Sequence, residues 1–413
     1  MERPRRTHRP TLTALVLAAL VVCPGPATSS SGNRVVAVGD LHGNVEAFTE
    51  ILRETGIVDA SLRWSGGHTT LVQMGDIVDR APRLREILDL LMRLEVEARA
   101  AGGQVVVLLG NHEIMDLLGV LREVDPGTYV SFTDERSEQR RNDAWRELVR
   151  VTRARARAQG APGPAVTDES RRRWLTAVPL GMVDFLTAFG PEGLYGRWLR
   201  SRPALLRIGD TVFVHGGLGP SLKGISLDEI ELRTHEELTT FDRLRAELAE
   251  RDLVQTTSSI HVVAAVARGE IERAGRLGSR PSSSDRRRAL QAEGLRPLDG
   301  WESWLIADPS GPLWNGAPTL WDESEDAEEL SELLAGFGIE HMVVGHIPRS
   351  DGRIACRFHG RLFLIDTLME HWPRRGAPSA LELENGTFTA IYLGAREVLF
   401  EASPAPRHGA SVP

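Results

Sequence analysis

The chain has 413 residues, 41% hydrophobic and 26% charged, so it can bury at least one large core and shows none of the compositional bias of collagen, coiled coils or disordered proteins. Its formal net charge of -8 argues against a nucleic-acid or anionic-membrane partner that is reached through bulk charge. We therefore expect no nucleic-acid partner and no stable membrane partner.

Residues 1–29 have the pattern of a cleavable signal peptide. The basic stretch MERPRRTHRP precedes TLTALVLAALVV, an apolar run too short to span a bilayer, and small residues suited to cleavage follow. We place the cleavage near Ser29 and expect a secreted or periplasmic protein. Lipid attachment at Cys23 is the less favoured alternative, because Val22 stands where lipoprotein signals carry a small residue.

The region 34–400 alternates between strands and helices in the way of an α/β core. Apolar runs predict strands at 34–38, 69–74, 104–109, 211–215, 342–345 and 361–366. Amphipathic patterns that end at glycine predict helices at 44–56 and 83–103. Two charged segments, about 114–203 and 218–335, predict helical insertions over the mouth of this core. The last strands, near ALELENGTFTAIYL, are expected to close a second sheet, and 401–413 is expected to be a disordered tail.

Polar side chains follow five of these apolar runs. Because the carboxyl ends of neighbouring strands meet at one crevice, we expect these side chains to converge. Carboxylate, amide and imidazole ligands suit divalent ions such as Mn, Fe or Zn, and six ligands are too many for one catalytic ion with open positions. We therefore expect two ions, with Asp76 shared between them. The predicted ligands are Asp40, His42, Asp76, Asn111, His215 and His346.

The blocks GDLHGN, GDIVDR, GNHE, HGG and a final GH resemble, in order and spacing, the calcineurin-like metallophosphoesterases of the phosphoprotein phosphatase type. GNHEIMDLLG, LYGRWLRSRP and GRLFLID are similar to the Shewanella-like branch. The resemblance implies an αββα sandwich of two mixed sheets flanked by helices, with helical insertions. It implies that Asp40, His42 and Asp76 hold one ion, and that Asp76, Asn111, His215 and His346 hold the other.

The same resemblance assigns roles to three further residues. His112 matches the general acid, Asp79 matches the carboxylate that orients it, and Arg80 matches an arginine that binds phosphate. Glu113 is expected to stabilise the turn rather than to take part in the chemistry.

Three positions depart from the family's pattern. Pro348 stands where many metallophosphoesterases carry a second histidine, which favours the phosphoprotein phosphatase branch. Gly316 stands where the Shewanella-like pattern has an arginine, so the source of a second phosphate ligand is open, and Ala81 replaces a glycine. Four residues separate Cys356 from Arg361, whereas five separate the cysteine and the arginine of cysteine-dependent phosphatases. We therefore expect Cys356 to be an inert thiol.

These residues predict a metal-dependent phosphomonoesterase in which a metal-bridging hydroxide attacks phosphorus in line. The expected substrate is a protein or peptide phosphorylated on serine, threonine or tyrosine. Nucleotides or dinucleoside polyphosphates are the first alternative. A non-catalytic binding module is the remote alternative, because the ligand set is complete.

Overall fold

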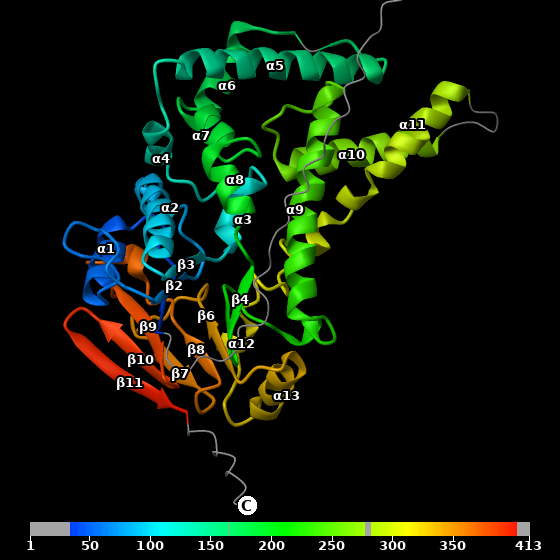
Figure 1. The fold of residues 1–413 in the computed structure, drawn as a ribbon. Coiled ribbons are helices and arrows are strands. Elements are labelled where there is room, and N and C mark those ends of the chain that lie inside the picture. The colour runs from blue at the N-terminus through cyan, green and yellow to red at the C-terminus, as the bar shows by residue number, and fades with distance from the viewer. Residues whose placement is uncertain (1–33, 164, 277–281, 403–413) are drawn as a thin grey trace, which may run out of the picture. The chain divides into compact units, whose positions relative to one another are not determined.

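The structure is a computed structural model that describes residues 34–163, 165–276 and 282–402 (Figure 1). The predicted signal peptide, 1–29, lies outside the described residues, as does nearly all of the predicted tail, 401–413. Among the described residues, no helix combines the length and the apolar character that crossing a membrane requires.

Six strands form the first sheet, in the order β11-β10-β9-β1-β2-β3. The first three strands along the chain are parallel neighbours, and β9 pairs with β1 in the antiparallel sense. Their bounds are β1 Val35–Val38, β2 Thr70–Gln73, β3 Gln104–Val107, β9 Ser379–Glu384, β10 Thr387–Tyr392 and β11 Ala395–Glu401.

Five strands form the second sheet, in the order β4-β5-β6-β8-β7. The central strands β5, β6 and β8 are parallel, and the two edge strands are antiparallel to their neighbours. Their bounds are β4 Leu205–Ile208, β5 Thr211–Val214, β6 His341–Val344, β7 Ala355–Arg357 and β8 Leu362–Leu364.

The two sheets pack face to face. Alternate side chains of each strand point to opposite faces of a sheet, so one apolar set from each sheet can fill the space between them. Ala37 and Val72 of the first sheet share a buried cluster with Phe213 and Phe363 of the second. The outer face of the first sheet packs on α1 (Val45–Glu54) and α2 (Leu84–Ala100), and the outer face of the second packs on α13 (Ala327–Phe337). This arrangement confirms the predicted αββα sandwich of two mixed sheets.

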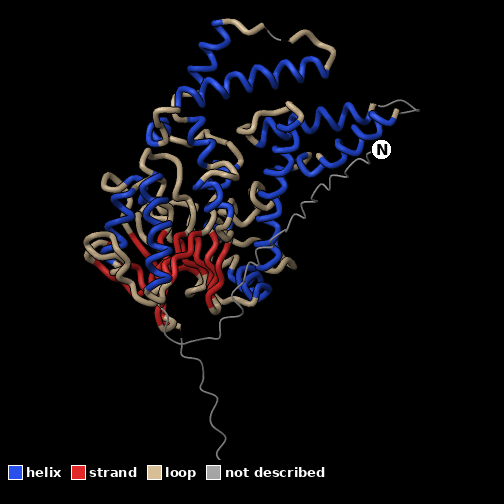
Figure 2. Tube along the Cα trace, turned by 45° about the horizontal axis from the view of Figure 1, so that its top comes forward, coloured by secondary structure: helices blue, strands red, loops and turns tan. Residues whose placement is uncertain are grey.

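Helices fill the two long connections of the core. Figure 2 shows the strands gathered together, with most of these helices on one side of them. Between β3 and β4 the chain forms α3 Asn111–Leu117, α4 Pro126–Ser131, α5 Ser137–Ala158, α6 Asp168–Ala177, α7 Met182–Ala188 and α8 Leu194–Arg200. Between β5 and β6, before α13, it forms η1 Pro220–Leu222, α9 Leu227–Glu250, α10 Ile260–Gly275, α11 Ser283–Gly294, η2 Arg296–Leu298, η3 Trp301–Ser303 and α12 Ala317–Leu320.

Two details differ from the sequence-based prediction. The strands near ALELENGTFTAIYL do not close the second sheet: β9 and β10 extend the first sheet, because β9 pairs along the free edge of β1, with Val35 opposite Leu383. The helix α13 begins inside the predicted second insertion, yet its Leu330 and Leu334 pack on the five-stranded sheet. It therefore belongs to the outer layer of the sandwich.

Candidate metal centre

The six predicted ligands come together at the carboxyl ends of strands from both sheets. Asp40 follows β1, Asp76 follows β2, Asn111 follows β3, His215 follows β5 and His346 follows β6. The backbone N–H of His346 donates to both oxygens of Asp40, at 3.1 Å each, although the two residues are 306 positions apart. The polar side chains that end the apolar runs thus gather at one site.

Asp76 lies at the centre of this cluster. Its Oδ2 is 3.5 Å from His42 Nε2 and 3.3 Å from His215 Nε2. Two groups of residues place their ligand atoms within 4.8 Å of one another, His42 with Asp76 and His112, and Asp76 with His215 and His346. Asp76 belongs to both groups, which is the position that a carboxylate shared by two ions would need.

The hydrogen bonds of two histidines fix which nitrogen faces the cluster. His42 Nδ1 donates to the carbonyl oxygen of Val78 at 2.9 Å, and His215 Nδ1 donates to the carbonyl oxygen of Met74 at 2.9 Å. A carbonyl oxygen can only accept, so Nε2 of each ring is the atom that can bind a metal ion. These contacts orient the rings in the way that outer partners orient metal-binding histidines.

The charge of the cluster fits divalent cations. Asp40 and Asp76 are both 2% exposed. Burial and the neighbouring carboxylates of Asp366 and Asp76 raise the pKa of Asp40 well above its usual value. Burial alone would lower the pKa of His215, but the Asp76 and Asp40 carboxylates raise it to about 10. The buried carboxylates therefore demand positive charge, which divalent ions would supply.

The turns that carry these side chains are strained. A positive φ is found at His42, Asp76, Asp79, Arg80 and His346, none of which is a glycine. Such residues cost about 1–3 kcal/mol each and persist where the surroundings impose the conformation. The glycines of the motifs permit close approach, since a Cβ on Gly110 would lie 2.2 Å from Asp76 Oδ1 and one on Gly345 would lie 2.4 Å from Asp40 Oδ1.

His112, Asp79 and Arg80 form a second arrangement beside the cluster. His112 Nδ1 lies 2.7 Å from Asp79 Oδ2, so Nε2 faces the centre, 3.9 Å from Asp76 Oδ2. Arg80 Nη2 lies 3.3 Å from the same Nε2. Burial alone would lower the pKa of His112, but the Asp76 and Asp79 carboxylates raise it above its usual value. A proton donor needs this direction of shift.

Glu113 has the structural position that the sequence indicates. Its buried carboxylate accepts from the backbone N–H groups of Asp76, Ile77 and Gly110 at 2.8 Å each, and from Val78 at 3.2 Å. The side chain therefore ties the turn after β2 to the turn after β3. All four of these contacts are with the backbone, so the role of Glu113 is to hold the two turns in register.

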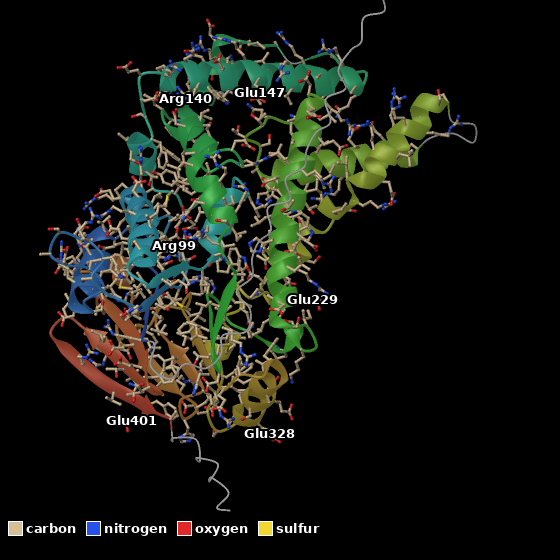
Figure 3. All side chains as sticks on the ribbon, viewed as in Figure 1. Arg99, Arg140, Glu147, Glu229, Glu328 and Glu401 are labelled. Atoms are coloured by element: carbon tan, nitrogen blue, oxygen red, sulfur yellow. The ribbon has the colours of Figure 1, made fainter. Side chains whose placement is uncertain are left out.

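We expect Glu113→Ala to lower the free energy of unfolding by roughly 3–5 kcal/mol, because four buried N–H groups would lose their charged acceptor. Urea unfolding followed by circular dichroism measures this change. Glu328→Ala is the control, since Glu328 is exposed on α13 (Figure 3), and its loss should be within about 0.5 kcal/mol. Equal stabilities of the two variants would contradict the role given to Glu113.

Two carboxylates of the site were missed by the sequence-based prediction. Asp366 follows β8, the parallel neighbour of β6, and is 5% exposed. Asp366 ends an apolar run, as the predicted ligands do, so the same sequence pattern could have identified it. Glu370 lies in η4 (Met369–His371), and its Oε2 is 2.8 Å from Arg80 Nη1. It follows no strand directly, so the pattern offered no signal for it.

The structure also shows the surroundings of Gly316 and Cys356. A Cβ on Gly316 would lie 2.7 Å from two side-chain carbons of Ile347, so a larger residue at this position requires the Ile347 side chain to move. Cys356 lies in β7, opposite Phe363, and packs against the cluster between the sheets. Burial raises the pKa of its thiol, as expected for an inert cysteine.

The chain is similar to known proteins in sequence and in fold. The Calcineurin-like phosphoesterase family matches residues 33–350. The chain is 34% identical over 191 residues to Shewanella-like protein phosphatase 2 of Arabidopsis thaliana, which covers 45% of this chain and 46% of the plant protein. It is 23% identical over 367 residues to Shewanella-like protein phosphatase 1 of Plasmodium berghei (strain Anka), which covers 87% of this chain and 74% of the relative. The chain thus spans about half the length of the plant relative.

Among solved structures, a cold-active protein-tyrosine phosphatase of a psychrophilic Shewanella species has a TM-score of 0.56 and 22% sequence identity. The likeness covers 89% of this chain and 80% of that protein, and it shows a shared fold. The family match covers more than half of the chain and agrees with the motifs, the sandwich and the Asp76 cluster. The chain therefore belongs to the calcineurin-like phosphoesterases.

Proposed function

We propose that this protein is a metal-dependent protein phosphatase that hydrolyses phosphomonoesters. The observation that carries the proposal is the presence of two features at one site, the ligand groups that share Asp76 and the His112–Asp79 hydrogen bond beside them. The relatives named Shewanella-like protein phosphatases support a phosphorylated protein or peptide as the substrate.

The residues of the chain take separate parts in this reaction. Divalent ions, when bound by the six ligands, supply positive charge for the phosphoryl oxygens and lower the pKa of a water molecule. Arg80 directs its planar group of N–H donors at the phosphoryl group and offsets its charge. His112 donates the proton on Nε2 to the leaving oxygen, and Asp79 holds the ring by Nδ1.

We further propose the identity of the ions, the phosphorylated residue and the location of the protein. Manganese, iron or zinc would each suit a mixed set of carboxylate, amide and imidazole ligands. The structural neighbour is described as a tyrosine phosphatase, so phosphotyrosine stands beside phosphoserine and phosphothreonine as the group removed. Export to the periplasm or the outside of the cell is supported by the signal-like pattern of residues 1–29.

One experiment separates this chemistry from that of a cysteine phosphatase. Phosphotyrosine and phosphoserine peptides, p-nitrophenyl phosphate and nucleotides are assayed with wild-type protein and with Cys356→Ser. We expect EDTA to remove all activity, Mn²⁺ to restore it, and Cys356→Ser to match the wild type, because Cys356 is in β7 and is half-buried. Activity that survives exhaustive chelation but is lost in Cys356→Ser would overturn the proposal. Hydrolysis of nucleotides alone would favour the small-molecule alternative.

A further inference from the structure

Glu370 directs a carboxylate toward Arg80 and the candidate metal centre. Its Oε2 lies 2.8 Å from Arg80 Nη1 and 3.5 Å from His42 Nε2. The Glu370 side chain is 10% exposed, whereas that of Arg80 is 42% exposed. The arginine proposed to bind the phosphoryl group is therefore already paired with an internal anion.

The loop that carries Glu370 is held in place by contacts distant in sequence. Asn44 Nδ2 donates to the carbonyl oxygens of Met369 at 2.9 Å and Trp372 at 3.0 Å. Leu368 has a positive φ of 59°, a conformation that a leucine adopts only when its surroundings impose it. The carboxylate consequently reaches Arg80 from a fixed backbone, and only its side chain can turn away.

A phosphoryl group that binds Arg80 must compete with this carboxylate. Burial alone would lower the pKa of Arg80, but Glu370 raises it above its usual value, so the pair is ionic. Gly316 stands where the Shewanella-like pattern has an arginine, and it has no side chain to offer a second cation. A phosphate that displaces Glu370 leaves a largely buried carboxylate without its cation and beside a new anion, which is unfavourable.

Glu370 also lines a pocket, together with His371, Arg374 and Arg375. Its Oε1 lies 3.2 Å from Nε2 of His371, whose side chain is 54% exposed. A cationic group that arrives with the substrate can reach the carboxylate from this side while the phosphate takes Arg80. An ion pair between the phosphate and Arg80 and another between the substrate's cation and Glu370 would then replace the pair between Arg80 and Glu370.

We propose that Glu370 is a specificity-determining residue, which selects phosphorylated peptides that carry a lysine or arginine next to the phosphorylated residue. The inference rests on the proposed function, because it concerns the substrates of the same site. Glu370 disfavours phosphoesters without a neighbouring cation and favours those that bring one. Selection of this kind combines an attractive contact with a repulsive one.

The test compares two phosphopeptides that differ only in arginine or alanine beside the phosphorylated residue. For the wild type we expect kcat/KM to be roughly tenfold higher for the arginine peptide, the size of one changed contact in a specificity site. Glu370→Gln should bring the two values together by raising kcat/KM for the alanine peptide. Glu86→Gln is the control, because Glu86 pairs with Arg83 at 2.6 Å on the surface, and it should behave as the wild type does. A preference that persists in Glu370→Gln would overturn the proposal.

Binding of inorganic phosphate gives a readout that does not depend on turnover. Calorimetry of the Mn²⁺-loaded protein should show phosphate bound more tightly by Glu370→Gln, by roughly tenfold, with unchanged metal content. Weaker phosphate binding together with lower metal content would contradict the proposal, because Glu370 would then be holding the ions or Arg80 in place. Tighter phosphate binding by a protein that hydrolyses no phosphopeptide would support the competition at Arg80 while rejecting the proposed function and its peptide selectivity.

Discussion

Asp76→Asn is expected to abolish hydrolysis and to reduce the bound metal, while the fold remains intact. Asp76 Oδ2 lies between His42 Nε2 and His215 Nε2, so its charge serves both ligand groups. An amide of the same shape keeps the hydrogen bond from the His112 backbone N–H, which Oδ1 accepts at 3.1 Å, but it loses the charge. We expect kcat/KM to fall by more than about 10³-fold, as when a group on which the whole catalytic unit depends is removed.

Metal analysis by mass spectrometry, turnover of p-nitrophenyl phosphate and thermal unfolding measure the three parts of this prediction. Asp143→Asn is a suitable control, because Asp143 forms an exposed ion pair with Arg146 on α5 at 2.7 Å. The control should keep both its metal content and its activity. If Asp76→Asn itself keeps the metal content and turnover of the wild type, Asp76 does not bridge two ions.

The sequence predicts the central strands because each is a run of apolar residues buried on both faces. β1, β2, β3, β5, β6 and β8 all lie within the predicted ranges or start one residue outside them. The edge strands are harder to recognise. β11 is largely exposed and contains Arg396 and Glu397, so it shows no continuous apolar run. The sheet to which β9 belongs depends on pairing with β1, which is more than 300 residues away, and no local pattern records that pairing.

The metal-binding set is predictable for a related reason. Each ligand sits within two residues of a glycine that lets the turn pass close to its neighbours, as Gly110 does beside Asp76 and Gly345 beside Asp40. The ligand and its glycine are close in sequence, so this pattern can be recognised without knowledge of the fold. Glu370 could not be predicted in this way, since its place depends on hydrogen bonds from Asn44, 325 positions from Met369, and on a left-handed Leu368.

His112→Asn is expected to keep the metal and to lower kcat by roughly 10²–10⁴-fold, the range for loss of a general acid. His112 Nδ1 is bound to Asp79 and its Nε2 faces the ligand cluster, so the ring is placed to give up a proton. His359→Asn is the matched control, because His359 is exposed in the turn between β7 and β8. Steady-state kinetics and metal content of both variants test the assignment.

The dependence on the leaving group distinguishes a proton donor from a metal ligand. His112 also falls in a ligand group with His42 and Asp76, so its nearness to the centre allows either role. An acid matters most when the departing oxygen is strongly basic, so the loss should be large for phosphoserine peptides and small for p-nitrophenyl phosphate. A metal ligand would affect every substrate equally, because all of them need the same ions. An equal loss across leaving groups, accompanied by a fall in metal content, would therefore make His112 a ligand and leave the departing oxygen to another donor.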